Sequence, residues 1–398
     1  MIQVSDQNFN DRRRVTAALL VGASSASIWG MTPAERLRRA LVRAGIDDVR
    51  AAGSAPPTEG DVVLLRADYV LDESLVHAVA AQPDTALAVP WGSGVRIVAA
   101  RVDAARAASV ELLLDDASAD AEALDGLAVL SSEEIASGYN QALRKREPPL
   151  VVALTEVPTS EVEWRMFGGA YKGVTDFVTK YVWPRPAFHV TRWAARRGWT
   201  PNAVTSASLV LVLAALAWFA VGSFAAGLVA AWAMTFLDTV DGKLARVTLT
   251  SSKFGNVFDH GIDLIHPPFW YVAWWHGLRG AHGHASAVLD DAMWIIVVGY
   301  VVGRLIEGLF LGVFRFEIHS WRPIDSFFRL ITARRNPNLV LLTAGVVAGA
   351  PSAGFLAVAA WTIFSLVFHA GRVLHALAGR AGGRAPVSWL DDRRVPRP

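Results

Sequence analysis

The residues best suited to chemistry are four aspartates that lie within a short stretch of the chain. They are Asp238, Asp241, Asp259 and Asp263, in two apolar segments joined by a polar link. On helices, the first two share one face, and the last two share another. Four carboxylates around one point repel one another unless cations lie between them. Because the chain has no cysteine, the ligands are oxygens, which Mg²⁺ or Mn²⁺ prefers.

Small and basic residues accompany these aspartates. Gly242, Ala245 and Gly255 leave space for a bulky or flat group beside the helix backbones. Arg246 is placed where a guanidinium could hold a phosphate through two hydrogen bonds. The alternative is an interhelical salt-bridge cluster, but Arg246 and Lys243 cannot neutralise four buried carboxylates. The combination indicates group transfer at a pyrophosphate.

The whole pattern, D-x2-D-G-x2-A-R-x8-G-x3-D-x3-D, resembles the signature of the CDP-alcohol phosphotransferase family, and all eight fixed positions match. The resemblance covers about residues 160–380. It implies a membrane enzyme that moves a phospho-alcohol group from CDP-diacylglycerol or another CDP-linked donor to an alcohol or phospho-alcohol acceptor. CMP would be released, as a step of phospholipid or polar-lipid synthesis. We also expect a homodimer and no nucleic-acid partner.

The resemblance assigns roles to individual positions. Asp238, Asp241 and Asp259 would bind a first divalent ion. Asp263 would contact a second ion and act as general base on the acceptor hydroxyl. The CDP moiety would contact a further set of residues, which are Asn202, Thr205, Gly242, Ala245, Arg246 and Gly255.

Two arginines farther along the chain are candidates for an acceptor pocket. Arg304 and Arg372 lie in later apolar segments, where charged residues are costly and usually functional. Either could hold a phosphate on the acceptor. For Arg304, an ion pair with Glu307 that orients helices is the alternative interpretation.

The elements that must position these residues form an all-α membrane domain at residues 201–380. We expect six spans, at residues 203–221, 224–241, 256–276, 291–314, 337–350 and 352–378, the fifth being short for a bilayer. Arginine and lysine concentrate in the links at 242–254 and 315–336 and in a basic tail at 381–398. The positive-inside rule therefore predicts cytoplasmic termini and an integral protein of the inner or plasma membrane. Aromatic and basic residues at 159–200 predict an interfacial amphipathic segment.

The chain before this segment has a different character. Residues 1–160 hold 15 Lys/Arg and 22 Asp/Glu, whereas the remainder is basic. Short apolar runs alternate with helical patterns, which predicts a cytosolic α/β domain with a largely parallel, Rossmann-type sheet at residues 1–158. Thr32 is expected to cap a helix that begins at Pro33, and residues 133–145 to form another helix. The first 14 residues lack the apolar core of a signal peptide.

This domain resembles, less closely, the nucleotidyltransferase of archaeal bifunctional inositol-phosphate cytidylyltransferase/di-inositol phosphate phosphate synthases. The run from Leu20 to Pro33 stands where such a domain keeps its phosphate loop, and Asp68 where it keeps a metal-binding aspartate. The loop lacks the glycines and the arginine, and Ser131-Ser132 replace the second aspartate. We therefore expect an inactive domain. A bifunctional enzyme, and a non-enzymatic transporter or scaffold that reuses the fold, are the alternatives.

Overall fold

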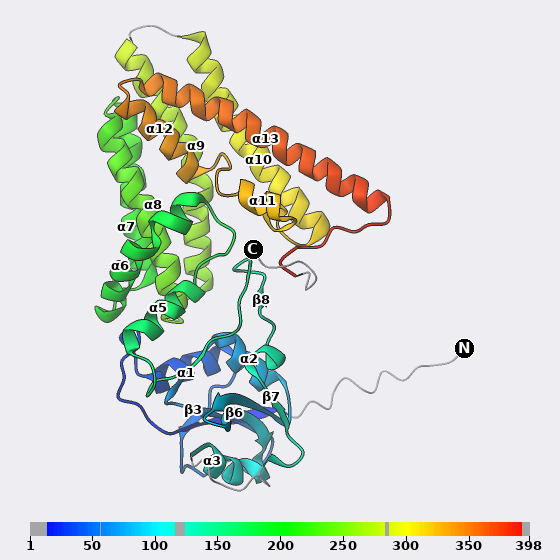
Figure 1. Cartoon of the computed structure of the whole chain (residues 1–398). Coiled ribbons are helices and arrows are strands. Elements are labelled where there is room, and N and C mark those ends of the chain that lie inside the picture. Colours follow the sequence, from blue (N-terminus) through cyan, green and yellow to red (C-terminus); the bar gives the residue numbers. More distant parts are fainter. Residues whose placement is uncertain (1–13, 56, 116–123, 283–285, 392–398) are drawn as a thin grey trace. The chain divides into compact units, whose positions relative to one another are not determined.

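The computed structural model describes residues 14–55, 57–115, 124–282 and 286–391. It forms two compact units, the first of Met1–Gly138 and Glu147–Gly169, the second of Tyr139–Arg146 and Ala170–Pro398 (Figure 1). A hairpin from the first part of the sequence therefore belongs to the second unit. The expectations for the N-terminal 13 residues and for the tail beyond 391 lie outside the described residues.

The first unit is built on a six-stranded sheet of order β2-β1-β3-β6-β5-β7. The strand bounds are β1 Val15–Val21, β2 Val49–Ala51, β3 Asp61–Arg66, β5 Thr85–Trp91, β6 Gly94–Asp103 and β7 Ala128–Leu130. Strand β1 is parallel to β2 and β3, and β5 is parallel to β7, whereas β6 is antiparallel to both neighbours. The α/β class is confirmed. The sheet is mixed rather than largely parallel because a two-residue turn, with Gly92 at φ 57°, reverses the chain between β5 and β6.

Helices and the short strand pair β4–β10 complete the first unit, whereas the β8–β9 hairpin, which interrupts its sequence, belongs to the second unit. Their bounds are α1 Pro33–Arg43, β4 Tyr69–Leu71, α2 Glu73–Ala81, η1 Ala104–Arg106, α3 Ala107–Asp115, α4 Ser132–Ile135, β8 Tyr139–Asn140, β9 Lys145–Arg146, β10 Val151–Ala153 and α5 Thr159–Gly169. Thr32 caps α1 as expected, accepting a hydrogen bond from the Glu35 backbone N–H. The helix predicted at 133–145 is wrong. Helix α4 stops before Gly138, and a β8–β9 hairpin follows, with Arg144 at φ 49° in its turn.

The second unit is helical. Its elements are η3 Val178–Val182, α6 Pro184–Arg196, α7 Pro201–Ala220, α8 Phe224–Val247, α9 Lys253–His282, α10 Ala287–Phe314, η4 Ile318–Ser320, α11 Pro323–Phe328, α12 Arg335–Val347 and α13 Pro351–Ala381. Each of the six expected apolar segments falls on a helix. Four helices in the described part of the chain are long and apolar enough to cross a membrane, namely α7, α8, α10 and α13.

The remaining two helices explain why six spans stay a prediction. Helix α12 has 13 residues, which at about 1.5 Å per residue is short of the ~30 Å apolar layer. Helix α9 has 30 residues, but Pro267 and Pro268 lie inside it, and charged residues and histidines interrupt its apolar sequence. Both helices nevertheless pack in the core of the unit, because Trp270, Trp274, Leu339 and Leu342 are buried there.

Helices α7 and α9 cross closely at one end. A Cβ on Gly277 would overlap the Phe219 carbonyl oxygen and lie 2.9 Å from the Gly222 nitrogen. Next to this crossing, the Trp270 indole N–H donates to the Val212 carbonyl at 3.0 Å. The Phe219 ring packs against Trp274, with ring centroids 4.9 Å apart. This contact fixes α9 against α7, and with it the start of α9, where Asp259 lies.

Replacing Gly277 by alanine should therefore destabilise the membrane unit. Overpacking at a close helix crossing costs about 1–3 kcal/mol, although alanine is the better helix former. Gly280→Ala on the same helix is the matched control, since nothing lies within 4 Å of its added Cβ. Thermal unfolding of the purified protein in detergent should show a lower midpoint for Gly277→Ala alone. Equal midpoints for the two variants would contradict the crossing described here.

Candidate active site

Three of the four aspartates converge at one point. Asp238 and Asp241 lie near the end of α8, and Asp259 lies in the first part of α9. One carboxylate oxygen from each lies within 4.8 Å of the other two. Asp241 is 3% exposed, and its Oδ1 atom has no hydrogen-bond partner among the described residues. An orphaned buried oxygen among hard donors fits a divalent cation.

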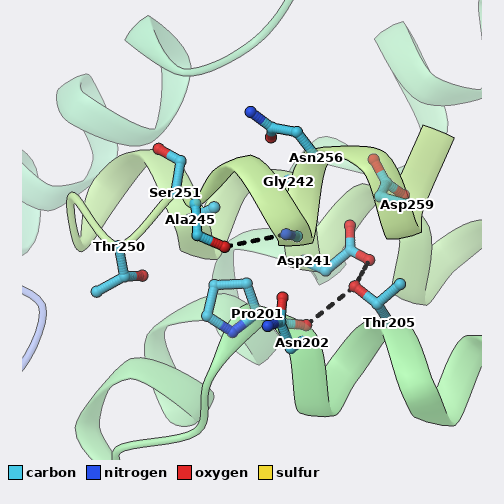
Figure 2. Close-up of a pocket in the computed structure, with 12 residues that line it drawn as sticks. Pro201, Asn202, Thr205, Asp241, Gly242, Ala245, Thr250, Ser251, Asn256 and Asp259 are labelled. Carbon is cyan, nitrogen blue, oxygen red and sulfur yellow. Dashed lines mark hydrogen bonds between the residues drawn. The ribbon is translucent and has the colours of Figure 1, made fainter.

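Helix α7 contributes the second side of the site. The Thr205 hydroxyl lies 2.6 Å from Asp241 Oδ2 and 3.0 Å from the Pro201 carbonyl oxygen. Figure 2 shows Thr205 facing Asp241 from the opposite helix. Thr200 caps α7 by accepting from the Ala203 backbone N–H at 3.2 Å. The cap fixes where α7 begins, and so places Asn202 and Thr205 at the site.

A small pocket, partly open to solvent, lies against the aspartates. It is lined by Pro201, Asn202, Thr205, Asp241, Gly242, Ala245, Thr250, Ser251, Ser252, Gly255, Asn256 and Asp259 (Figure 2). The structure thus brings together five of the six residues expected at the CDP moiety. Gly255 has a steric reason to be glycine, because a Cβ there would lie 2.7 Å from Asn202 Oδ1.

The sixth expected residue, Arg246, lies beside this pocket. Its Nη1 donates to the Ala170 carbonyl at 3.2 Å, and its guanidinium lies next to Gly242. Lys243, one turn earlier, places its ammonium 3.9 Å from the centre of the Tyr171 ring. The two residues at 170–171 therefore hold both cations that follow Asp241 in the sequence.

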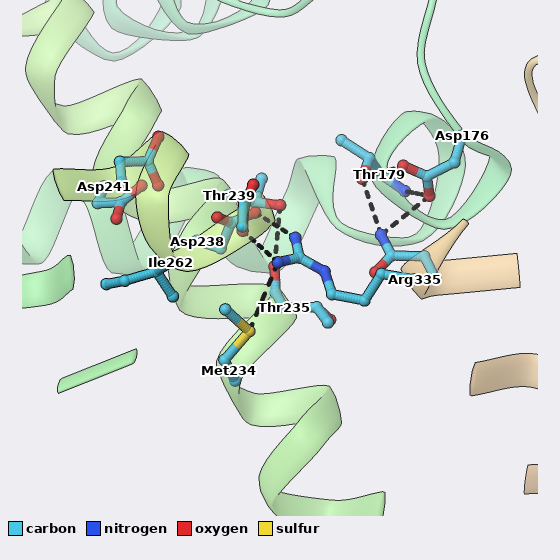
Figure 3. A network of polar contacts seen from close by, with 12 residues as sticks. Asp176, Thr179, Met234, Thr235, Asp238, Thr239, Asp241, Ile262 and Arg335 are labelled. Carbon is cyan, nitrogen blue, oxygen red and sulfur yellow. Dashed lines mark hydrogen bonds and ion pairs between the residues drawn. The ribbon is translucent and has the colours of Figure 1, made fainter. Parts of the chain in front are cut away.

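An arginine that the sequence interpretation missed bridges two of the aspartates. Arg335, at the start of α12, donates from Nη2 to Asp238 Oδ2 at 2.6 Å and from Nη1 to Asp263 Oδ1 at 2.5 Å. Figure 3 shows its guanidinium directed at Asp238. Asp263 therefore stands apart from the triad, with its side chain 40% exposed. The signal available in the sequence was the pair Arg334-Arg335 at the start of an apolar segment, where a cation needs a partner.

The two acceptor-pocket candidates both have carboxylate partners. Arg304 donates to Glu307 at 3.0 Å, and Glu307 also pairs with His319 at 3.1 Å and with Arg334. Arg372 makes two hydrogen bonds to the buried Asp325, at 2.6 and 2.9 Å. The ion pair between Arg304 and Glu307 is the alternative interpretation that their spacing of three residues on one helix suggested. Neither arginine lines the pocket beside the aspartates.

The first unit shows a different environment around its candidate residues. Asp68 accepts two hydrogen bonds from Arg66, at 2.8 and 2.7 Å. In the loop after β1, Trp29 is buried, and its backbone N–H donates to Glu163 at 2.8 Å. A large indole thus lies within the run from Leu20 to Pro33, and the guanidinium of Arg66 contacts both carboxylate oxygens of Asp68.

Comparison with known proteins agrees with this geometry. A family model described as CDP-alcohol phosphatidyltransferase matches residues 199–366. No curated protein matches the chain. A crystal structure of the phosphatidylinositol phosphate synthase of Mycobacterium tuberculosis with CDP-DAG bound is similar over 53% of this chain and 100% of that chain. The identity is 20% and the TM-score 0.40, and a likeness at that level supports no argument about function.

The position of Arg335 predicts how cations bind to the site. Arg335→Gln removes a positive charge that competes for Asp238, so Mn²⁺ should bind more tightly, by roughly fivefold. Electron paramagnetic resonance titration of the full-length protein in detergent measures this affinity. Arg334→Gln, whose guanidinium pairs with Glu307 instead, is the neighbouring control and should change it less. Weaker Mn²⁺ binding by Arg335→Gln would show instead that the guanidinium assembles the carboxylates.

Proposed function

We propose, from the match of a CDP-alcohol phosphatidyltransferase family model to residues 199–366, that this chain is a transferase of substituted phosphate groups. It moves a phosphatidyl-type group from a CDP-linked lipid such as CDP-diacylglycerol to an alcohol or phospho-alcohol, with release of CMP. The observation that carries the proposal is the contact between the aspartate triad and the pocket. Asp241 and Asp259 belong to both.

The pocket suits the nucleotide end of the donor. Asn202 and Thr205 of α7 offer polar side chains, and Gly242, Ala245 and Gly255 leave the helix backbones uncovered. A flat base can lie against such a surface, and the adjacent guanidinium of Arg246 suits the diphosphate. The donor would thus be held with its phosphates toward the aspartates.

Asp238, Asp241 and Asp259 would hold the divalent cation, Mg²⁺ or Mn²⁺. When bound, the cation neutralises charge on the donor diphosphate and on the leaving CMP. The three carboxylates would fix the position of the cation, because Asp238 and Asp241 are held on the same helix and the Thr205 hydroxyl orients Asp241. We place a second cation near Asp263, as the family resemblance implies.

Asp263 is our general base. Its carboxylate is partly exposed, so an acceptor hydroxyl can reach it, and the Arg335 guanidinium lies 2.5 Å from it. In the reaction, the acceptor oxygen forms the new bond to phosphorus as its proton passes to Asp263. The bond between that phosphorus and the bridging oxygen breaks, and CMP leaves with the bond electrons.

The acceptor site is the less defined part of the proposal. Arg304 and Arg372 would have to exchange Glu307 and Asp325 for an acceptor phosphate. We therefore assign them the role of positioning the helices around the acceptor. The protein would be integral to the inner or plasma membrane, with six spans and both termini cytoplasmic, as the distribution of Arg and Lys favours. The homodimer is an expectation from the family resemblance alone.

We propose that the first unit does not transfer nucleotides. The support is that Asp68 is engaged by Arg66 and that the buried Trp29 fills the loop after β1. The bifunctional alternative needs a carboxylate that is available to a cation. A domain without catalytic function would act in stability or regulation.

Each motif aspartate can be tested by an isosteric change. Asp238→Asn, Asp241→Asn, Asp259→Asn and Asp263→Asn should each lower CMP release from labelled CDP-diacylglycerol by at least roughly 100-fold, assayed with a panel of acceptors. Mn²⁺ affinity should fall for the first three and less for Asp263→Asn. Asp291→Asn, exposed near the start of α10, is the control. Near-normal turnover in any motif variant would refute the role given to that residue.

The absence of nucleotide transfer in the first unit can be tested separately. Asp68→Ala should leave CMP release unchanged, because its carboxylate pairs with Arg66 and not with the transfer site. The full-length protein should release no pyrophosphate from CTP with inositol phosphate or a sugar phosphate. Pyrophosphate release that disappears in Asp68→Ala would establish the bifunctional alternative.

A further inference from the structure

A buried arginine in the second unit makes no hydrogen bond or ion pair with the described residues, and Asp176 is the nearby carboxylate that attracts it. Arg329 follows α11 and is 7% exposed. Its Nε and Nη1 atoms are buried, and no hydrogen bond or ion pair reaches its side chain from the described residues. A guanidinium keeps its charge at any physiological pH, and burying an unpaired charge costs several kcal/mol. The fold therefore retains a buried charge that needs an anion.

Three separate segments meet around Arg329. The Phe177 backbone N–H donates to the Leu330 carbonyl at 2.9 Å, which joins residues 172–177 to the end of α11. The Gly173 backbone N–H donates to the Leu143 carbonyl at 2.8 Å, which joins the same segment to the β8–β9 hairpin. A Cβ on Gly173 would lie 2.6 Å from the Arg144 carbonyl oxygen, so the hairpin is packed tightly there.

These segments bring more cations than carboxylates. Arg144 pairs with Glu317 at 2.5 Å, but its Nε is also buried without a partner. Lys172 is half-buried and, in the described chain, forms neither an ion pair nor a hydrogen bond. Burial, with Arg144 and Arg246 nearby, lowers the pKa of Lys172 to about 8. A nearby anion would reverse that effect.

The nearby carboxylates do not balance this charge. Asp176 accepts from Asn336 at 3.0 Å and from the Thr179 hydroxyl at 2.8 Å, with no hydrogen bond from Arg329. Glu307 is shared among Arg304, Arg334 and His319, and burial lowers the pKa of His319 well below its usual range, so that it is neutral. Two positive charges remain in excess between the five cations and the three carboxylates, which are Arg144, Lys172, Arg304, Arg329 and Arg334 against Asp176, Glu307 and Glu317.

We propose that Arg329, Lys172 and Arg144 form a binding site for a phosphate monoester, separate from the aspartate triad. A doubly charged oxyanion matches the excess charge, and its several oxygens can accept from donors on three segments at once. The hairpin at Tyr139–Arg146 thereby gives the membrane unit a ligand-binding residue from within the first unit's sequence. The ligand is either a soluble phosphomonoester or the headgroup of an anionic lipid.

The test measures binding without turnover. Full-length protein in neutral detergent with EDTA, which removes divalent ions from the aspartates, is titrated with radiolabelled inorganic phosphate by equilibrium dialysis. Arg329→Gln and Lys172→Met should each weaken binding by roughly tenfold or more. Arg322→Gln is the matched control, because its exposed side chain stands at the other end of α11, on the Trp321 ring. Thermal unfolding checks the fold of each variant.

Three outcomes would overturn the proposal. They are no phosphate binding by the wild-type protein at millimolar concentrations, unchanged binding by folded Lys172→Met, and loss of binding in Arg246→Gln but not in Arg329→Gln. The last result would place the anion at the donor phosphates. A further experiment with lipid then shows whether the ligand is a lipid headgroup or a soluble phosphomonoester. Nanodiscs of phosphatidylcholine with one-fifth phosphatidic acid should abolish phosphate binding if the ligand is a headgroup, and leave it intact if it is soluble.

Discussion

The structure around the site depends on the repulsion among carboxylates held close together in a poorly solvated place. Asp238, Asp241 and Asp259, on helices α8 and α9, approach within 4.8 Å through one oxygen each. Charges at this distance and burial persist only beside cations. Arg335 supplies one positive charge, shared by Asp238 and Asp263. A divalent ion would supply the rest, which is why we propose a metal-dependent transfer.

The same principle, with the sign reversed, applies to the cationic cluster that contains Arg329. There the fold gathers guanidinium groups and leaves one of them unpaired. Phosphoryl transfer needs both kinds of environment, since anionic substrates must be neutralised and a base must remain free to accept a proton. Lys172 lies between the two environments, because it acts electrostatically on both Asp259 and Arg144.

Local periodicity was enough to predict that Asp238 and Asp241 share one helix face and that Gly255 and Asp259 share another, whereas the place of Gly242 and Gly255 beside a nucleotide came from the family resemblance. Residues three and four apart share a helix face whatever the rest of the fold does, so α8 and α9 could be drawn from spacing alone. Arg335 could not be predicted this way, because 97 residues separate it from Asp238 and 72 from Asp263. The hairpin at 139–146 was missed because its apolar residues also fit a helix, whereas helix α4 ends at Ile135. The antiparallel strand β6 depends on a turn whose geometry the alternation of apolar residues does not encode.

The central claim is that the aspartates place a cation on the diphosphate of a CDP-linked lipid. Electron–nuclear double resonance on Mn²⁺-loaded protein with CDP-diacylglycerol measures the coupling between the bound metal and phosphorus nuclei. We expect a resolved ³¹P coupling in the wild-type protein that is lost in Asp241→Asn. Bound Mn²⁺ that shows no ³¹P coupling with saturating donor would contradict the account.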